Sequence, residues 1–70
     1  MDWRPYITID SNVCHGIACI KGTRIPVSAI LDNLAAGLGE EEIIESYPSL
    51  DFTSIGAVIA YAADLTHDVE

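Results

Sequence analysis

Positive charge is scarce in this 70-residue chain: three lysine and arginine residues stand against eleven aspartate and glutamate residues, which leaves a net charge of −8. No lysine or arginine follows Arg24, and residues 36–70 carry the whole negative excess. Such a surface repels phosphate groups and attracts positive ones. The composition therefore argues that the protein does not bind duplex DNA by itself, and it favours a basic protein partner.

A long apolar run is also missing. A helix that spans a membrane needs about 20 consecutive apolar residues, and the chain has no run of that length. Residues 1–5 have neither the basic start nor the apolar core of a secretion signal. We therefore expect a cytoplasmic protein without a membrane-bound part.

Cysteine is nearly absent, and its spacing differs from that of the usual zinc motifs. Cys14 and Cys19 are the two cysteines, His15 follows the first, and His67 is far along the chain. Zinc ligands typically come in pairs about two to four residues apart, which these residues do not. We expect two reduced thiols that act as small buried side chains; a disulfide between them and a metal site are the lesser alternatives.

The motifs of common enzymes are missing as well. No nucleophile stands in a recognisable arrangement with a base, and no glycine-rich loop could cradle a phosphate. The sequence therefore predicts a protein without catalytic activity, catalytic residues, bound metal or cofactor.

The chain is short for its hydrophobic content, since 50% of its residues are hydrophobic. A single domain of this size buries only about 60% of the surface of its unfolded chain, so it is marginally stable alone. A second copy would cover the surplus apolar surface. We therefore expect a homodimer, with a compact monomer as the alternative.

We expect residues 1–27 to form an extended N-terminal part. Residues 6–9 are rich in β-branched and aromatic side chains, which favours a short strand. Residues 17–21 and 23–26 predict two further extended stretches. Strands this short need helices or a partner strand for support.

A turn separates the last two stretches, and Gly22 suits it because glycine readily adopts a positive φ. The turn consists of Lys21, Gly22, Thr23 and Arg24, and it holds two of the three basic side chains. Thr23 and Arg24 could bind an anion. The preferred interpretation is structural: Thr23 bonds the turn, and Arg24 pairs with a nearby carboxylate.

We expect residues 28–65 to form three helices, which a polar tail at 66–70 follows. In the first, residues 28–36, apolar side chains recur at helical spacing, Ser28 is the expected N-cap and Gly37 ends the helix. The second covers residues 40–46, with a glutamate-rich first turn that suits the helix dipole.

The third helix, residues 52–65, begins after Asp51, a good N-cap. Its expected buried face is Phe52, Ile55, Val58, Ile59 and Ala62. The opposite face has small residues and one tyrosine, which suit a close contact with another protein chain. The predicted partner-binding residues on it are Ala57, Ala60, Tyr61 and Asp64.

Several short motifs occur in order along the chain. They are IKGTRIPV at residues 20–27, IL at 30–31, LAAG at 34–37, EEII at 41–44, YPSL at 47–50 and AYAA at 60–63. This set resembles the bacterial family called domain of unknown function 433, with two departures, at Ala18 and Gly56. The resemblance implies a small helix-turn-helix-like domain that acts as the antitoxin of a toxin–antitoxin pair, encoded beside a nuclease-like toxin.

The predicted fold is therefore mainly α: one domain in which short N-terminal strands precede a homeodomain-like, helix-turn-helix bundle. A DNA-recognition helix needs Arg, Lys, Asn or Gln to read base edges, and the third helix has none of them. The favoured function is a non-enzymatic protein-interaction module, an antitoxin-like partner of a nuclease-type toxin. The alternatives are a dimeric DNA-binding regulator and a homodimer of purely structural role.

Overall fold

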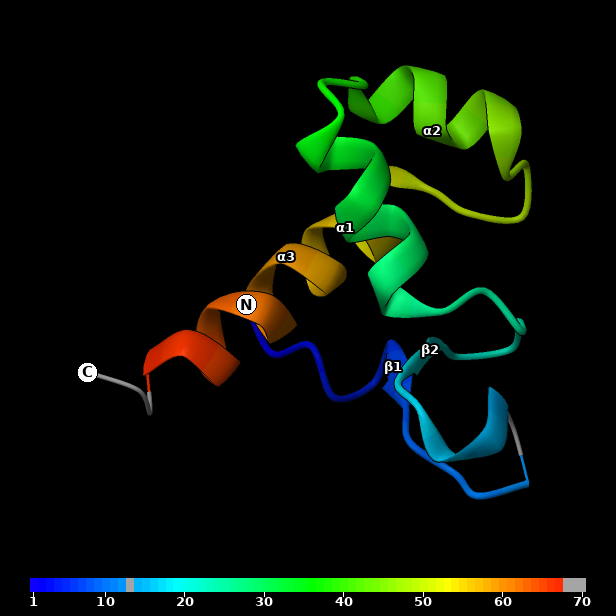
Figure 1. Ribbon diagram of the computed structural model, residues 1–70, viewed down its shortest axis with the longest axis vertical. Helices are drawn as coiled ribbons and strands as arrows, with labels where there is room; N and C mark the ends of the chain where they lie inside the picture. The colour runs from blue at the N-terminus through cyan, green and yellow to red at the C-terminus, as the bar shows by residue number, and fades with distance from the viewer. Residues whose placement is uncertain (13, 68–70) are drawn as a thin grey trace.

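The computed structural model describes residues 1–12 and 14–67, and the three helices dominate it (Figure 1). The elements in order are β1 (Ile7–Thr8), the 3-10 turn η1 (Cys14–Gly16), β2 (Cys19–Ile20), α1 (Val27–Ala35), α2 (Glu40–Ser46) and α3 (Phe52–His67). The mainly α fold with short N-terminal strands is confirmed. Of the predicted tail 66–70, Thr66 and His67 belong to α3, and residues 68–70 lie outside the described part.

Helix α1 is central: it contacts both α2 and α3, which also contact each other. In Figure 1 α1 lies in the middle of the view, α2 lies above it, and α3 runs towards the lower left. The hydrophobic core draws on all three helices and on both strands. Its buried residues are Ile7, Ile20, Val27, Ile30, Ile43, Leu50, Ile55 and Val58.

The two strands form an antiparallel pair in which Ile7 lies opposite Ile20. The third predicted stretch does not become a strand, and it pairs only through a bridge between Cys19 and Pro26. Proline has no backbone N–H to donate, so the ladder cannot continue at this position.

The turn after β2 is held by Thr23. Its backbone N–H and its hydroxyl both donate to the carbonyl oxygen of Ile20, at 3.0 and 2.7 Å, and the hydroxyl accepts from the N–H of Ile25 at 3.1 Å. Gly22 has a φ of +81°, as the turn prediction required. The structural interpretation of Thr23 is therefore confirmed.

Helix α1 begins one residue earlier than predicted. The N-cap position belongs to Pro26, which makes no side-chain cap, so the prediction of Ser28 as N-cap is wrong. Proline's fixed φ suits a helix start, which explains the shift. At the other end α1 stops at Ala35, one residue before the predicted bound. Gly37 is left-handed as predicted, with a φ of +91°, and it donates to the carbonyl of Leu34 at 3.0 Å.

Helix α2 has the predicted bounds, and α3 has the predicted N-cap. The carboxylate of Asp51 accepts hydrogen bonds from the backbone N–H of Ser54 at 2.8 Å and from its hydroxyl at 2.9 Å. These two bonds, the backbone one first, lower the pKa of Asp51 below its ordinary value of 3.8. None of the helices in the described part is long and apolar enough to cross a membrane.

The left-handed turn residue offers a stability test. An alanine at Gly22 meets no atom within 4 Å, so it is disfavoured by backbone conformation alone. We expect Gly22→Ala to lower the free energy of unfolding by about 1–2 kcal/mol. Gly56→Ala is the matched control, because it lies inside α3 and should instead stabilise by up to about 1 kcal/mol. Urea denaturation of both variants decides this, and equal stabilities for Gly22→Ala and the wild type would contradict the turn's role.

The cap of α3 offers a pH test. Because the folded-state pKa of Asp51 lies below its unfolded value, its stabilising effect is complete above the unfolded pKa and disappears as pH falls through the folded one. Asp51→Asn keeps a capping oxygen but does not titrate. We expect the wild type to lose stability relative to Asp51→Asn below about pH 4. Parallel pH profiles of their denaturation midpoints would contradict this.

Candidate interaction surface

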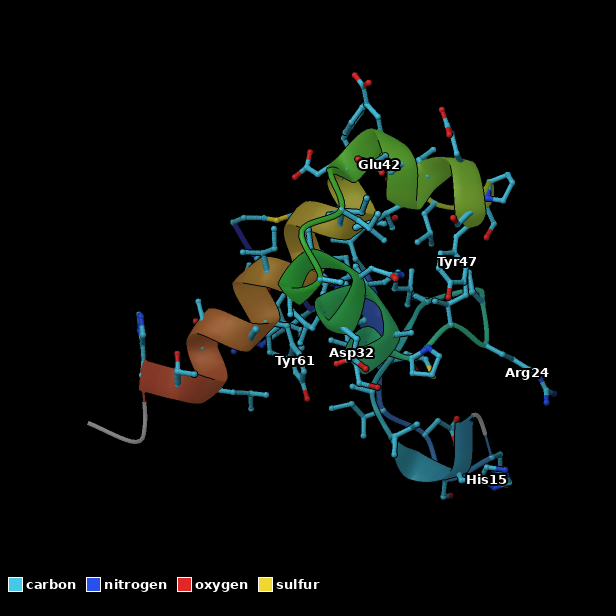
Figure 2. All side chains as sticks on the ribbon, turned by 45° about the horizontal axis from the view of Figure 1, so that its top comes forward. His15, Arg24, Asp32, Glu42, Tyr47 and Tyr61 are labelled. Atoms are coloured by element: carbon cyan, nitrogen blue, oxygen red, sulfur yellow. The ribbon has the colours of Figure 1, made fainter. Side chains whose placement is uncertain are left out.

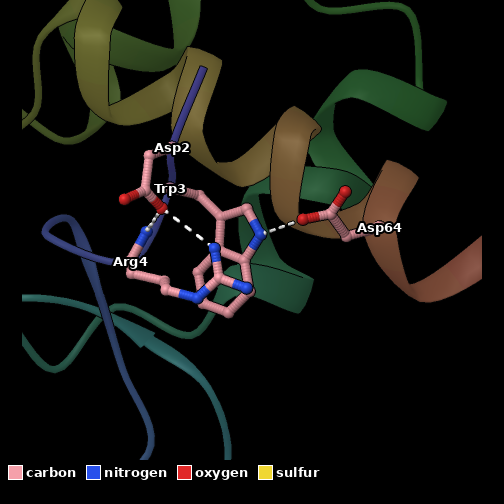
Figure 3. A network of polar contacts seen from close by, with 4 residues as sticks. All are labelled: Asp2, Trp3, Arg4 and Asp64. Atoms are coloured by element: carbon pink, nitrogen blue, oxygen red, sulfur yellow. Dashed lines mark hydrogen bonds and ion pairs between the residues drawn. The ribbon is translucent and has the colours of Figure 1, made fainter.

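The first four residues lie against α3 and form what we call the N-terminal strap, residues 1–4 (Figure 3). The indole N–H of Trp3 donates to the carboxylate of Asp64 at 2.5 Å. The Trp3 ring also meets the Tyr61 ring edge to face, with 4.6 Å between the centroids and an angle of 79°. Trp3 therefore connects the N-terminal strap to the C-terminal half of α3, and it also packs against the core.

Arg4 is occupied within the strap. Its guanidinium lies 3.2 Å from the carboxylate of Asp2, and its central carbon lies 5.0 Å from the centroid of the Trp3 ring. The backbone N–H of Arg4 also donates to Asp2, and these contacts lower the pKa of that carboxyl group below its ordinary value. The strap thus neutralises one of the three cations internally.

The predicted partner-binding face is not an open surface. Ala57 is completely buried, Ala60 and Tyr61 are half-buried, and Asp64 is exposed but bonded to Trp3. The prediction of an exposed face is therefore wrong for Ala57. The physical reason is that this side of α3 packs into the fold, and the strap covers part of the remainder. Sequence spacing gave no signal that Trp3 returns to α3.

The outward side of α3 carries instead two residues that we expected in the core. Phe52 is 56% exposed and Ile59 is 45% exposed. They are seven residues apart, so they lie on the same side of the helix two turns from each other. The prediction that both are buried is wrong, because the buried side of α3 is rotated around the helix axis towards Ala57.

Further apolar groups adjoin these two. Gly56 lies between them on the helix, and a β-carbon placed there would be 3.9 Å from the sulfur of Met1, which is itself 68% exposed. Ala63 continues the same side one turn after Ile59. We call this surface the outer stripe: Met1, Phe52, Gly56, Ile59 and Ala63.

Helix α2, which contacts α3, is strongly acidic. Its four glutamates, Glu40, Glu41, Glu42 and Glu45, are all exposed, and the Glu42 carboxylate accepts a hydrogen bond from the backbone N–H of Gly39 at 3.3 Å. Within residues 1–12 and 14–67, the only ion pair is that between Arg4 and Asp2. The negative charge of α2 is thus uncompensated inside the chain.

The basic turn lies elsewhere, between β2 and α1. The side chain of Arg24 extends away from the ribbon (Figure 2) and makes no ion pair with a described residue. The expectation that it pairs with a carboxylate is therefore wrong. The turn borders a hollow of about 450 Å³ that is lined by Thr8, Lys21, Gly22, Thr23 and Arg24.

Among the residues that the structure describes, no three His, Cys, Asp or Glu side chains could hold a metal ion. Cys19 is completely buried, as predicted, but it is not a free thiol. The expectation of a reduced thiol is thus wrong for Cys19.

Comparison with known proteins identifies the family. Residues 7–62 match the family model described as protein of unknown function (DUF433). The chain belongs to this family. Its fold is similar to that of a DUF433 member from Anabaena variabilis, with a TM-score of 0.81 and 30% sequence identity, over 91% of this chain and 63% of that one.

A second known protein is also similar in sequence. The uncharacterized protein y4eO of Sinorhizobium fredii is 34% identical over 59 residues, which are 84% of this chain and 27% of y4eO. The chain thus spans about a quarter of that relative and less than two thirds of the Anabaena protein. The family resemblance that the sequence motifs indicated is therefore confirmed.

The strap contact is testable by substitution of Trp3. Trp3→Ala removes a half-buried ring together with its contact to Tyr61, and we expect a loss of about 1–3 kcal/mol in unfolding free energy. Trp3→Phe keeps a ring but lacks the N–H donor, so it should cost about 1 kcal/mol. Thermal denaturation followed by circular dichroism measures both, and unchanged melting of Trp3→Ala would show that the strap does not contribute.

Proposed function

We propose that this DUF433 domain is a non-enzymatic protein-interaction module whose outer stripe docks onto another protein. The observation that carries the proposal is the exposure of Phe52 and Ile59 at a two-turn spacing on α3. Large apolar side chains at this spacing are the usual anchors when a helix face binds a partner. Met1, whose sulfur lies 3.9 Å from the position of a β-carbon at Gly56, adds a flexible apolar side chain between them.

The charge beside the stripe points to a basic partner. Asp51 immediately precedes Phe52, and α2, whose four glutamates form no ion pair with a described residue, contacts α3. Charges at the rim of an interface raise the association rate of an oppositely charged partner more than they raise affinity. A basic nucleic-acid-processing protein, such as the nuclease-like toxin of a toxin–antitoxin pair, has this chemistry, and we assign the domain the antitoxin-like role.

A homodimer through the same stripe is the second candidate. It is supported by the exposure of Met1, Phe52 and Ile59 in so small a chain, since a second copy would cover them. A dimeric DNA-binding regulator has less support, because α3 has no Arg, Lys, Asn or Gln to contact bases.

The decisive experiment uses the product of the neighbouring reading frame. We expect Phe52→Glu and Ile59→Glu to weaken its binding at least about tenfold, because each places a charge within a buried apolar contact. Thr53→Glu is the matched control, since it adds the same charge on an exposed position next to Phe52. Titration calorimetry measures the affinities, and circular dichroism checks folding. Equal affinities for Phe52→Glu and Thr53→Glu would contradict the proposal.

Light scattering of the same proteins separates the two candidates. A dimer mass that becomes a monomer mass of 7.5 kDa in Phe52→Glu, without any binding to the neighbouring gene product, would favour the homodimer. Fluorescence anisotropy with duplex DNA tests the regulator: tight, salt-sensitive binding by the pure protein would favour it over the interaction module.

A further inference from the structure

The cations outside the N-terminal strap gather at one turn. Arg4 is paired with Asp2 and lies over the Trp3 ring. The two other basic residues, Lys21 and Arg24, are both exposed, and neither has an acidic partner within 4 Å among the described residues. The protein has a net charge of −8. Two cations in one turn without a paired carboxylate therefore form a candidate binding site for an external anion.

Both cations border the same hollow. Its lining of Thr8, Lys21, Gly22, Thr23 and Arg24 contains no acidic residue, and its volume is about 450 Å³. Sites for small ligands typically measure about 300–1,000 Å³. The hollow therefore has the capacity for a small organic molecule that carries an anionic group.

The backbone beneath the cations is held in place. The N–H of Lys21 donates to the carbonyl of Tyr6 at 2.8 Å, which ties the turn to the residue just before β1. The N–H of Ile20 donates to the carbonyl of Ile25 at 3.0 Å, and Thr23 closes the turn with its own bonds. The positions of both cation-bearing residues are therefore set before any ligand arrives, which reduces the entropy cost of binding.

Hydrogen-bond donors remain available at the same place. The backbone N–H groups of Gly22 and Arg24, and the half-buried hydroxyl of Thr8, make no hydrogen bond within the described residues. Gly22 has no side chain, and even a β-carbon there would meet no atom within 4 Å. An oxyanion can thus approach the backbone of the turn directly.

The acidic helix does not neutralise the turn through ion pairs. The turn precedes α1, whereas the first turn of α2, Glu40–Glu42, follows it. Neither Lys21 nor Arg24 forms an ion pair with a glutamate of α2. Both cations therefore stay available to an external anion.

From these observations we infer that the turn Lys21–Arg24 binds the phosphate group of a small phosphomonoester. Arginine offers a planar pair of N–H groups that matches phosphate oxygens, and lysine adds a point charge. Two cations balance a phosphate dianion, whereas they are too few to hold a duplex against the protein's net charge. The site uses none of the residues of the outer stripe, so it stands or falls independently of the proposed docking function.

The test follows the backbone N–H signals of Gly22, Thr23 and Arg24 by nuclear magnetic resonance at low salt. The probes are inorganic phosphate, adenosine monophosphate, and adenosine as the phosphate-free control. We expect saturable shifts of these signals with both phosphates and none with adenosine. Comparison of the two affinities shows whether the site prefers free phosphate or an organic phosphomonoester. We expect the nucleotide to bind more tightly.

Arg24→Gln and Arg4→Gln form a matched pair, since each removes one positive charge. We expect Arg24→Gln to weaken binding of adenosine monophosphate at least tenfold, and Arg4→Gln to change it by less than about twofold because that cation is already paired. Equal losses of affinity in both variants would show that only the net charge of the protein matters. That result would overturn the proposed site.

Two further results would also overturn the inference. Equal shifts with adenosine would show that the phosphate is not recognised, and the absence of turn shifts at millimolar phosphate would show that no site exists. A short oligothymidine that binds more tightly than adenosine monophosphate would make a nucleic-acid strand the ligand in place of a small phosphomonoester.

Discussion

The structure depends on the burial of α1 between its two neighbours. Ile30 of α1, Ile43 of α2 and Ile55 of α3 are completely buried in one cluster. Each such side chain contributes about 1.5–3 kcal/mol when it leaves water, and a chain of 70 residues has few others to replace it. The strands join the same cluster through Ile7 and Ile20, so a hairpin too short to be stable alone is held by the helices.

The core is small, and the residues outside it are the ones that can contact a partner or a ligand. In sequence, the acidic residues of α2 and the basic turn Lys21–Arg24 lie on either side of α1, and neither group forms an ion pair within the described part of the chain. The outer stripe on α3 is apolar and uncovered, with Phe52 and Ile59 as its large members. The described part of this small DUF433 domain thus presents three chemically different surfaces.

The strap helps to explain why the buried side of α3 differs in part from the predicted one: Ile55 and Val58 are buried as expected, but Phe52 and Ile59 are exposed and Ala57 is buried. A helical pattern states which residues share a side, but a helix with apolar residues around most of its circumference has no unique buried side. In α3 the choice was decided by packing on α1 and by Trp3, whose indole meets Tyr61 and Asp64. That contact joins residues 61 positions apart, a relation that no local pattern encodes.

Local interactions were therefore predictable, and long-range ones were not. The sequence alone determined the bounds of α2, the cap at Asp51 and the left-handed glycines at 22 and 37, because backbone conformation and neighbouring side chains decide them. It also determined the family and the location of the whole net negative charge in residues 36–70. Only the tertiary structure decided that Ala57 is buried, that Phe52 and Ile59 face outward and that Arg24 lacks an acidic partner. These outcomes depend on how helices rotate to pack and on which distant side chains meet, and both are set by the whole fold.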